Sequence, residues 1–452
     1  MKTILEGKNP HTARIFAAVA VLAGLSLFGW KTLFAQDAIA TPVRIDRVEV
    51  EGNRITDSDV ILREIPFIFP DVLDASDLTL VRNKVQNLRL FNCVEVRVDE
   101  RDGLNVLTVL VTESWYLFPA PVLYVNDRDW HKISYGLELT DGNFRGRNEK
   151  LRAGGSLGYD PSYFLNYSIP WVGERQRLML SIGVSQRGNE NRVFDFQESR
   201  LGFNLRLGKR LSLELETNVQ FSLTRVRLPV EYRAFSVSAR GQDIAPSLSW
   251  HVRWEHRDLT EYPRKGTYLE TNLQRTGFGK DQPDLWRMTF DGRFYEPLPG
   301  SLSLGVRQLF ILTGGTMPIY DRVYLGYYER VRGYYNVVLP DPALWADYKS
   351  YNISLTSVEF RFPILGVRYF TIKNGPLIPS LFRNLKFGLS AGIFLDNAVI
   401  WRNAGDIRLD RFYTGYGAGI HIHLPYVNVL RIEYAFNRKG RGQLIFDTGV
   451  SF

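Results

Sequence analysis

The sequence predicts an N-terminal α+β module of order β-α-α-β-β, followed by a 16-stranded antiparallel transmembrane β-barrel. Three observations predict this fold. An alternation of apolar and polar residues with a period of two runs from about Glu113 to the end of the chain. Most alternating segments are close to the length of about 9 to 11 residues that a tilted strand needs to cross a bilayer. The N-terminus has the features of an export leader.

Composition narrows the class of protein. Aromatic residues make up 13% of the chain, which suits a β-rich protein with aromatic belts at membrane interfaces. The net charge of +8 would permit nucleic-acid binding, but Lys and Arg alternate with Asp and Glu and form no basic block, so we expect no nucleic-acid partner. The single cysteine, Cys93, allows neither a disulfide framework nor a cysteine-based zinc site, and is expected to be a small buried apolar side chain.

Residues 1–40 are expected to be a signal peptide. Three cations precede an apolar run from 15 to 30, and small-residue cleavage sites follow at Ala35 and at Ala38-Ile39-Ala40. A membrane anchor is the alternative, with Trp30-Lys31 at the interface, but the run is shorter than the usual span of about 20 residues. After the leader, no stretch is long and apolar enough for a transmembrane helix. An exported chain of this kind is either periplasmic or an outer-membrane barrel.

Residues 41–113 are expected to form a compact module. Strict alternation predicts its first strand, and a Gly52-Asn53 turn follows. Capping residues and apolar residues at helical spacing predict two helices, the second opening at Asp74, before two strands that are separated by an Asp102-Gly103 turn. The predicted elements are a strand at 43–50, helices at 56–65 and 74–88, and strands at 94–98 and 104–111.

This order, with Val50-Glu51-Gly52-Asn53 and Leu90-Phe91-Asn92-Cys93-Val94, resembles a POTRA domain, the periplasmic module of the BamA superfamily of outer-membrane assembly and secretion proteins. An exposed edge at 94–98 would pair with an extended client by β-augmentation. The alternative is a spacer that only positions the barrel.

Residues 114–452 are expected to form the barrel. Leu211, Leu213, Val219 and Phe221 share one face, and the residues between them are polar, which predicts lipid outside and a polar lumen inside. Sixteen strands are predicted, at 115–124, 133–140, 148–158, 162–170, 176–187, 192–207, 211–225, 243–255, 266–275, 284–295, 301–311, 351–362, 385–396, 412–422, 427–436 and 443–452.

Further segments extend the resemblance to the BamA superfamily over the mature chain. Asp141 to Arg147 is similar to an early hairpin of the family, and Tyr262 to Tyr268 resembles its Pro-x-x-Gly turn. The C-terminal alternation with a final aromatic residue resembles the sorting signal of outer-membrane barrels. The signature Val331, Arg332, Gly333 and Tyr334 lies in a long insert at 312–348, much longer than an ordinary hairpin loop.

The family resemblance implies that this loop folds into the lumen and that acidic residues on the barrel wall hold its arginine. By position these residues are Asp396 and Glu359, and both fall on the polar face of their strands. A planar guanidinium suits this task because it binds a carboxylate through two parallel hydrogen bonds. The alternatives are an exposed arginine in a turn and, for Asp396, a carboxylate that caps a strand end.

The first and last strands are expected to meet at a weak seam. Pro119 and Pro121 remove two amide donors from the first strand, and we place Phe446, Gly449 and Phe452 on the facing strand. A seam with few hydrogen bonds would open to a nascent strand. The alternative is that the prolines only protect an edge strand from unwanted pairing.

No enzymatic motif stands out. His421 and His423 share a strand face but lack ligand spacing for zinc, and Gly415-x-Gly417-x-Gly419 lacks the following helix of a phosphate site. We therefore expect no enzyme, no cofactor and no metal.

The expected function is assembly, insertion or translocation of outer-membrane proteins, with the barrel in the outer membrane and the module in the periplasm. Expected partners are outer-membrane lipids, unfolded outer-membrane or secreted clients, and periplasmic chaperones or lipoproteins. The alternatives are a dedicated secretion pore for specific partner proteins and a passive outer-membrane channel.

Overall fold

The computed structural model describes residues 42–125, 131–173, 176–191, 196–322, 325–326, 331–335, 350–372 and 379–452. All elements below belong to one compact unit, Val43–Phe452. The expected signal peptide, residues 1–40, lies outside the described residues. Within the described ranges, no helix has the length and apolar character needed to cross a membrane.

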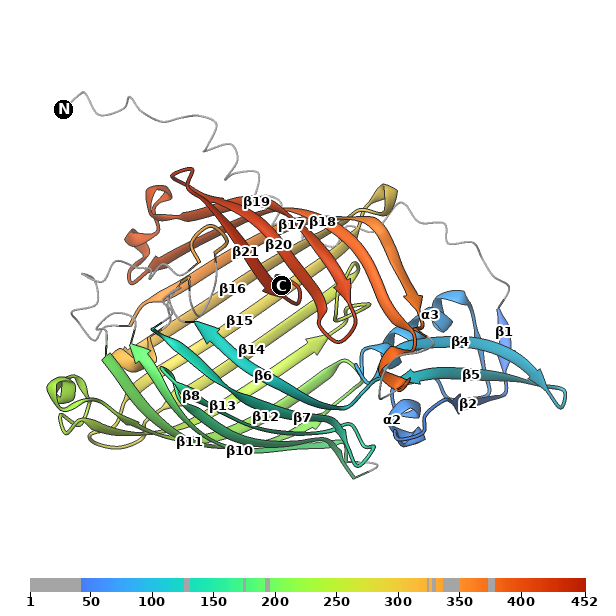
Figure 1. Ribbon diagram of the computed structural model, residues 1–452, viewed down its shortest axis with the longest axis horizontal. Helices are drawn as coiled ribbons and strands as arrows, with labels where there is room; N and C mark the ends of the chain where they lie inside the picture. The colour runs from blue at the N-terminus through green and yellow to red at the C-terminus, as the bar shows by residue number, and fades with distance from the viewer. Residues whose placement is uncertain are drawn as a thin grey trace. The chain divides into compact units, whose positions relative to one another are not determined.

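The N-terminal module has the predicted β-α-α-β-β order, with one short strand added (Figure 1). A three-stranded sheet has the order β2-β5-β4, in which β2 runs parallel to β5 and β4 antiparallel to it. The additional strand β3 pairs with β1. The elements are β1 (Val43–Ile45), β2 (Arg47–Glu51), α2 (Ser58–Leu62), β3 (Asp71–Leu73), α3 (Ala75–Gln86), β4 (Phe91–Arg101) and β5 (Leu104–Glu113).

Several boundaries in the module differ from the prediction, for example those of β4, which is three residues longer at each end, and two of the differences have local reasons. The first strand is divided at Asp46, whose N–H donates to the Asn105 carbonyl at 2.9 Å while its carboxylate accepts the Asn105 N–H at 3.0 Å. Helix α2 ends at Leu62, three residues before the predicted end, because the N–H groups of Glu64 and Ile65 donate to carbonyls three residues back and form a tighter turn before Pro66. Helix α3 opens as predicted, because Asp74 accepts the N–H groups of Ser76 and Asp77.

The barrel sheet contains the predicted sixteen strands, each antiparallel to its neighbours, from β6 at one end to β21 at the other (Figure 1). Backbone pairing is thus continuous from one end of the sheet to the other, with register shifts in the β7–β8, β9–β10 and β17–β18 pairs. The strands are β6 (Leu117–Val125), β7 (Ile133–Phe144), β8 (Glu149–Gly158), β9 (Ser162–Val172), β10 (Leu178–Asn191), β11 (Phe196–Arg210), β12 (Leu215–Arg227), β13 (Gln242–Glu255), β14 (Gly266–Thr276), β15 (Asp284–Pro297), β16 (Ser303–Thr316), β17 (Asn352–Phe370), β18 (Leu385–Trp401), β19 (Tyr413–Leu424), β20 (Asn428–Asn437) and β21 (Gly442–Thr448).

Side-chain exposure follows the two-residue period. On β12, Val219, Phe221 and Leu223 are 46%, 40% and 41% exposed, whereas Asn218 is 5% exposed. The apolar side chains therefore face outward, as in a barrel whose outer surface meets lipid.

The polar lumen that we predicted is wrong for one part of the wall. Leu309 and Ile311 on β16 are buried, while Phe310 and Leu312 between them point outward. They belong to an apolar cluster that also contains Leu285, Ile353, Leu355 and Val331 of the long loop. The reason is that the inserted loop shields this wall from water.

Several strand boundaries also need correction: β17 continues to Phe370 and β18 to Trp401, eight and five residues past their predicted ends. Strand β12 begins at Leu215, so Leu211 and Leu213 lie in the preceding turn, where the Leu211 N–H donates to the Leu215 carbonyl at 2.8 Å. Strand β21 ends at Thr448, four residues before the predicted end. Gly449 adopts a φ of 81°, which glycine permits at low cost, and turns the last residues out of the ladder.

The module packs against turns at one end of the barrel. Arg210 forms two hydrogen bonds with the buried Glu64 of the module, at 2.5 and 2.7 Å. The side chain of Asn87 donates to the Asp258 carbonyl and accepts the N–H of Thr260. The contacts of Asn87 attach the end of α3 to the turn between β13 and β14.

Cys93 provides a test of the module's packing. Burial, supported by the nearby Glu95 carboxylate, raises the pKa of the Cys93 thiol to about 11. Because the thiolate is the reactive form, we expect slow maleimide labelling of the folded protein at pH 7.5 and fast labelling in urea. The control is an Arg97→Cys variant that also carries Cys93→Ala, since Arg97 is exposed and its replacement should label quickly in both conditions. Rapid labelling of native Cys93 would contradict the buried position.

Candidate functional site: an arginine clamp inside the barrel

The loop between β16 and β17 brings Val331, Arg332, Gly333 and Tyr334 into the barrel interior. Val331 is fully buried in the apolar cluster, and Arg332 is 2% exposed. Residues 323–324, 327–330 and 336–349 of the predicted insert lie outside the described residues.

Asp396 on β18 binds Arg332 through a two-pronged contact. The Arg332 Nε donates to Asp396 Oδ2 at 2.8 Å, and Nη2 donates to Oδ1 at 2.7 Å. The backbone N–H of Arg332 also donates to Oδ2, at 3.0 Å. This arrangement fixes the guanidinium in one plane, which a point charge such as lysine cannot reproduce.

Two further carboxylates and an aromatic ring complete the surroundings of Arg332. Its Nη1 donates to Glu359 Oε2 on β17 at 2.6 Å and to Glu433 Oε1 on β20 at 3.1 Å. The guanidinium lies over the ring of Phe394, 3.6 Å from its centroid, which adds a cation–π attraction. We call Arg332, Asp396, Glu359 and Glu433 the arginine clamp; it joins the loop to three strands.

Each glutamate of the clamp has a second cation. Glu359 binds Arg361 at 2.6 Å, and Glu433 binds Arg431 at 2.8 Å. Three arginines thus face three carboxylates, all with side chains no more than 3% exposed. This balance matters because an unpaired buried ion costs several kcal/mol.

Close backbone contacts explain two glycines at the clamp. Gly333 has a φ of 91°, and a Cβ there would come within 2.9 Å of the Phe436 backbone on β20. A Cβ at Gly415 on β19 would collide with the carbonyl oxygen of Arg332. Any larger residue at either position would push the loop away from the wall.

The loop also contacts the last strand. Tyr335 donates its N–H to the side chain of Gln443 on β21 at 3.0 Å, and the Gln443 amide donates back to the Tyr335 carbonyl at 3.0 Å. Arg431 bonds Asp447 of β21 at 3.0 Å and the Gly449 carbonyl at 2.8 Å. The clamp is therefore linked to one of the two edge strands of the barrel sheet.

Of the residues expected at the seam, three lie on the edge strands β6 and β21, whereas Phe452 lies elsewhere. Pro119 and Pro121 lie on the edge strand β6, opposite Leu139 and Leu137 of β7, and Phe446 on β21 points outward with 65% exposure. Phe452 does not face the seam: it is 2% exposed and packs against Tyr295 and the Arg361 guanidinium. The turn at Gly449 is the physical reason for this correction.

One clamp residue, Glu433, and three residues that contact the clamp were missed in the sequence. Glu433, Arg431 and Arg361 are charged residues on the inward faces of their strands. The two-residue alternation therefore indicated that they point into the barrel. Phe394 interrupts the polar face of β18 with an aromatic ring.

His421 and His423 hydrogen-bond Tyr262 and Ser390 at 2.8 and 3.0 Å. The described ranges contain no group of three or more His, Cys, Asp or Glu arranged for a metal.

Replacing Arg332 tests the clamp. Arg332→Ala leaves Asp396 and Glu359 without their shared cation, and we expect about 3 to 5 kcal/mol of destabilisation. Arg332→Lys should recover only part of this loss because it cannot form the two-pronged contact. Thermal unfolding in detergent is the measurement, and Arg206→Ala, a solvent-exposed arginine on the polar face of β11, is the control. Equal stability of the alanine variant and the wild type would contradict the clamp's structural role.

Comparison with known proteins gives a distant curated relative. The outer membrane protein assembly factor BamA of Nitratidesulfovibrio vulgaris is 22% identical over 302 residues, which are 65% of this chain and 38% of that protein. The chain thus spans well under half the length of that relative.

One solved structure shows the same fold at low sequence identity. BamA from Haemophilus ducreyi lacking POTRA domains 1–3 matches with a TM-score of 0.53 and 14% identity, over 90% of this chain and 83% of that one. CdiB from Escherichia coli matches with a TM-score of 0.49 and 12% identity, over 99% and 98% of the two chains.

Family models match both parts of the chain. Residues 43–114 match the POTRA model, described as a surface antigen variable number repeat. Residues 143–452 match the Omp85 superfamily domain. This second match covers more than half of the chain and includes the loop and every strand that contributes to the clamp. The chain therefore belongs to the Omp85 superfamily, whose barrels lie in the outer membrane.

Proposed function

We propose that this protein assembles or inserts outer-membrane proteins, with residues 41–113 as a POTRA module in the periplasm and residues 114–452 as the barrel. Residues 1–40 act as a cleaved leader that exports the chain. No covalent bond is made or broken in this activity. The protein lowers the barrier to strand insertion by offering a backbone edge to a client.

The observation that carries the proposal is the pair of edge strands. Within the described residues, β6 pairs only with β7 and β21 only with β20. Pro119 and Pro121 lack the N–H groups that a regular ladder would use on β6. An edge with missing donors exchanges partners more easily, and a client strand would form hydrogen bonds there before it is released into lipid.

The arginine clamp supports the other side of this seam. Through Arg431 and Gln443 it connects β20 and β21 to the loop and to the wall strands β17 and β18. We infer that this wall stays rigid while β6 moves. A seam with one fixed edge and one movable edge can open while the rest of the barrel stays folded.

A dedicated secretion pore remains the second candidate, and a passive channel is the third. The apolar cluster and the clamp fill the interior next to β15–β18, which disfavours a wide aqueous channel there. Depletion of the protein separates the three functions. Broad loss of outer-membrane barrels is the result expected here, whereas loss of one secreted protein would indicate the pore and altered solute uptake alone the channel.

Restoring the backbone N–H donors that are missing at Pro119 and Pro121 tests whether a weak β6 edge limits opening of the seam. We expect the double variant Pro119→Val and Pro121→Val to strengthen pairing at this edge, at roughly 1 kcal/mol per hydrogen bond gained. The barrel should melt at a higher temperature and insert clients more slowly into liposomes. Val122→Ile, a conservative change on the same strand, is the control. Faster insertion by the double variant would contradict a seam limited by β6 opening.

A further inference from the structure

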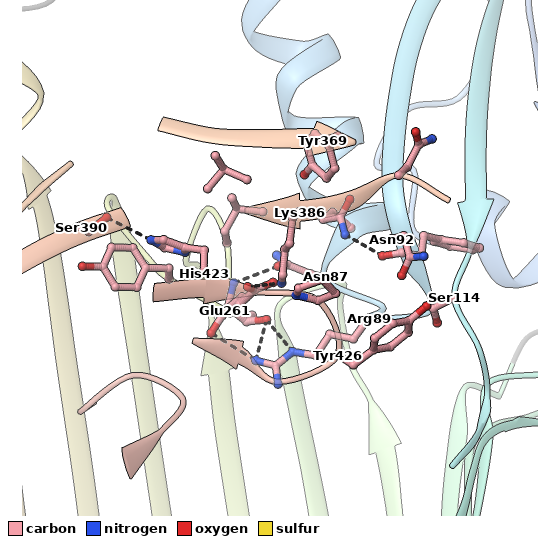
Figure 2. Close-up of a pocket in the computed structure, with 18 of the residues that line it drawn as sticks. Asn87, Arg89, Asn92, Ser114, Glu261, Tyr369, Lys386, Ser390, His423 and Tyr426 are labelled. Carbon is pink, nitrogen blue, oxygen red and sulfur yellow. Dashed lines mark hydrogen bonds and ion pairs between the residues drawn. The ribbon is translucent and has the colours of Figure 1, made fainter. Parts of the chain in front are cut away.

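A cavity lies where the module meets the end of the barrel. Its volume is about 460 Å³, within the range of ordinary ligand sites. Figure 2 shows Arg89 and Asn92 of the module and Glu261, Lys386 and Tyr369 of the barrel among its lining residues.

The lining carries an excess of positive charge. Four cations line the cavity, Arg89, Arg264, Arg361 and Lys386, and Glu261 is the one carboxylate among its described lining residues. Lys386 is paired with Glu261 and Arg361 with Glu359, which leaves an excess of two positive charges, those of Arg89 and Arg264. An excess of this size attracts an anionic group.

Arg361 supplies a donor that is not used by the protein. Its Nε binds Glu359 and its Nη1 donates to the Pro263 carbonyl at 3.2 Å, whereas Nη2 has no hydrogen-bond partner in the described part of the chain. The residue is 2% exposed and lines the cavity. A buried guanidinium N–H without an acceptor is costly, and a phosphate or carboxylate oxygen would satisfy it.

Part of the remaining lining is apolar, and this part continues onto the outer surface. Leu365, Val367 and Tyr369 of β17 line the cavity, and Ile364, Val367, Tyr369 and Phe370 on the same stretch are 45% to 57% exposed. Strand β16 pairs with β17 only as far as Arg361, so this stretch forms an open apolar margin beside the cavity. Phe118 and Tyr426, whose rings lie 5.2 Å apart, also line it.

We propose that this cavity binds an anionic lipid, with the headgroup phosphate among the cations and the acyl chains along the apolar margin of β17. The proposal rests on the membrane orientation proposed above, which puts this end of the barrel at the periplasmic leaflet. An extended peptide is the less favoured occupant. Two register shifts between Pro363 and Arg368 interrupt the regular spacing that strand addition requires.

Lipid retention tests the proposal. The purified full chain is equilibrated with equal amounts of phosphatidylglycerol and phosphatidylethanolamine in detergent, and bound lipid is measured by native mass spectrometry. We expect preferential retention of phosphatidylglycerol by the wild type, and about tenfold weaker retention by the Arg89→Gln and Lys386→Gln double variant. Lys386→Arg keeps the charge and should retain the lipid even if the double variant folds poorly.

The matched control removes two cations elsewhere in the barrel, through Arg206→Gln and Arg225→Gln, and should keep the wild-type preference. Equal retention by the cavity variant and the wild type would overturn the proposal. Displacement of the lipid by sn-glycerol 3-phosphate at equal concentration would also contradict the proposal. So would a photo-crosslinker at Tyr369 that captured protein in place of lipid. Client insertion is measured separately, so loss of lipid binding with intact insertion leaves the proposed function standing.

Discussion

The placement of one buried guanidinium among three carboxylates is the constraint on which the interior of this barrel depends. Arg332 comes from a loop, whereas Glu359, Asp396 and Glu433 come from strands that have other neighbours to satisfy. Burying these ions is tolerable only because each has an opposite charge within hydrogen-bonding distance. The loop must therefore return to one position, and that requirement accounts for the glycines at 333 and 415.

The clamp and the open edges together describe a barrel with unequal halves. The wall from β17 to β21 is joined by side-chain ion pairs in addition to backbone pairing, while β6 has β7 as its one strand partner in the described residues. The module binds turns on both parts of the wall, through Glu64 with Arg210 on one and through Thr112 with Asn384 on the other. In the function proposed above, the seam therefore opens at the proline-containing edge.

The fold could be predicted from the sequence because the two-residue period reports which face of each strand meets lipid. The same period placed Glu359 and Asp396 inward, but choosing them as partners of Arg332 needed the family resemblance. We did not predict Glu433 as a partner of Arg332. The alternation shows which face of a strand a residue lies on, but not which residues of different strands lie close together. The inward turn at Gly449 and the apolar cluster around Val331 were also missed, because both arise from tertiary packing of segments that still alternate.

The separation along the chain between clamp partners has a consequence for how this barrel itself enters the bilayer. Arg332 and Glu433 are 101 residues apart, so the loop is made long before its last counter-charge. Strands that entered hydrocarbon one at a time would carry Glu359 or Asp396 into a low dielectric with their charges incompletely neutralised, at a cost of several kcal/mol for each ion. The C-terminal third of the chain is therefore expected to cross into lipid as a preassembled block, with its charges already matched.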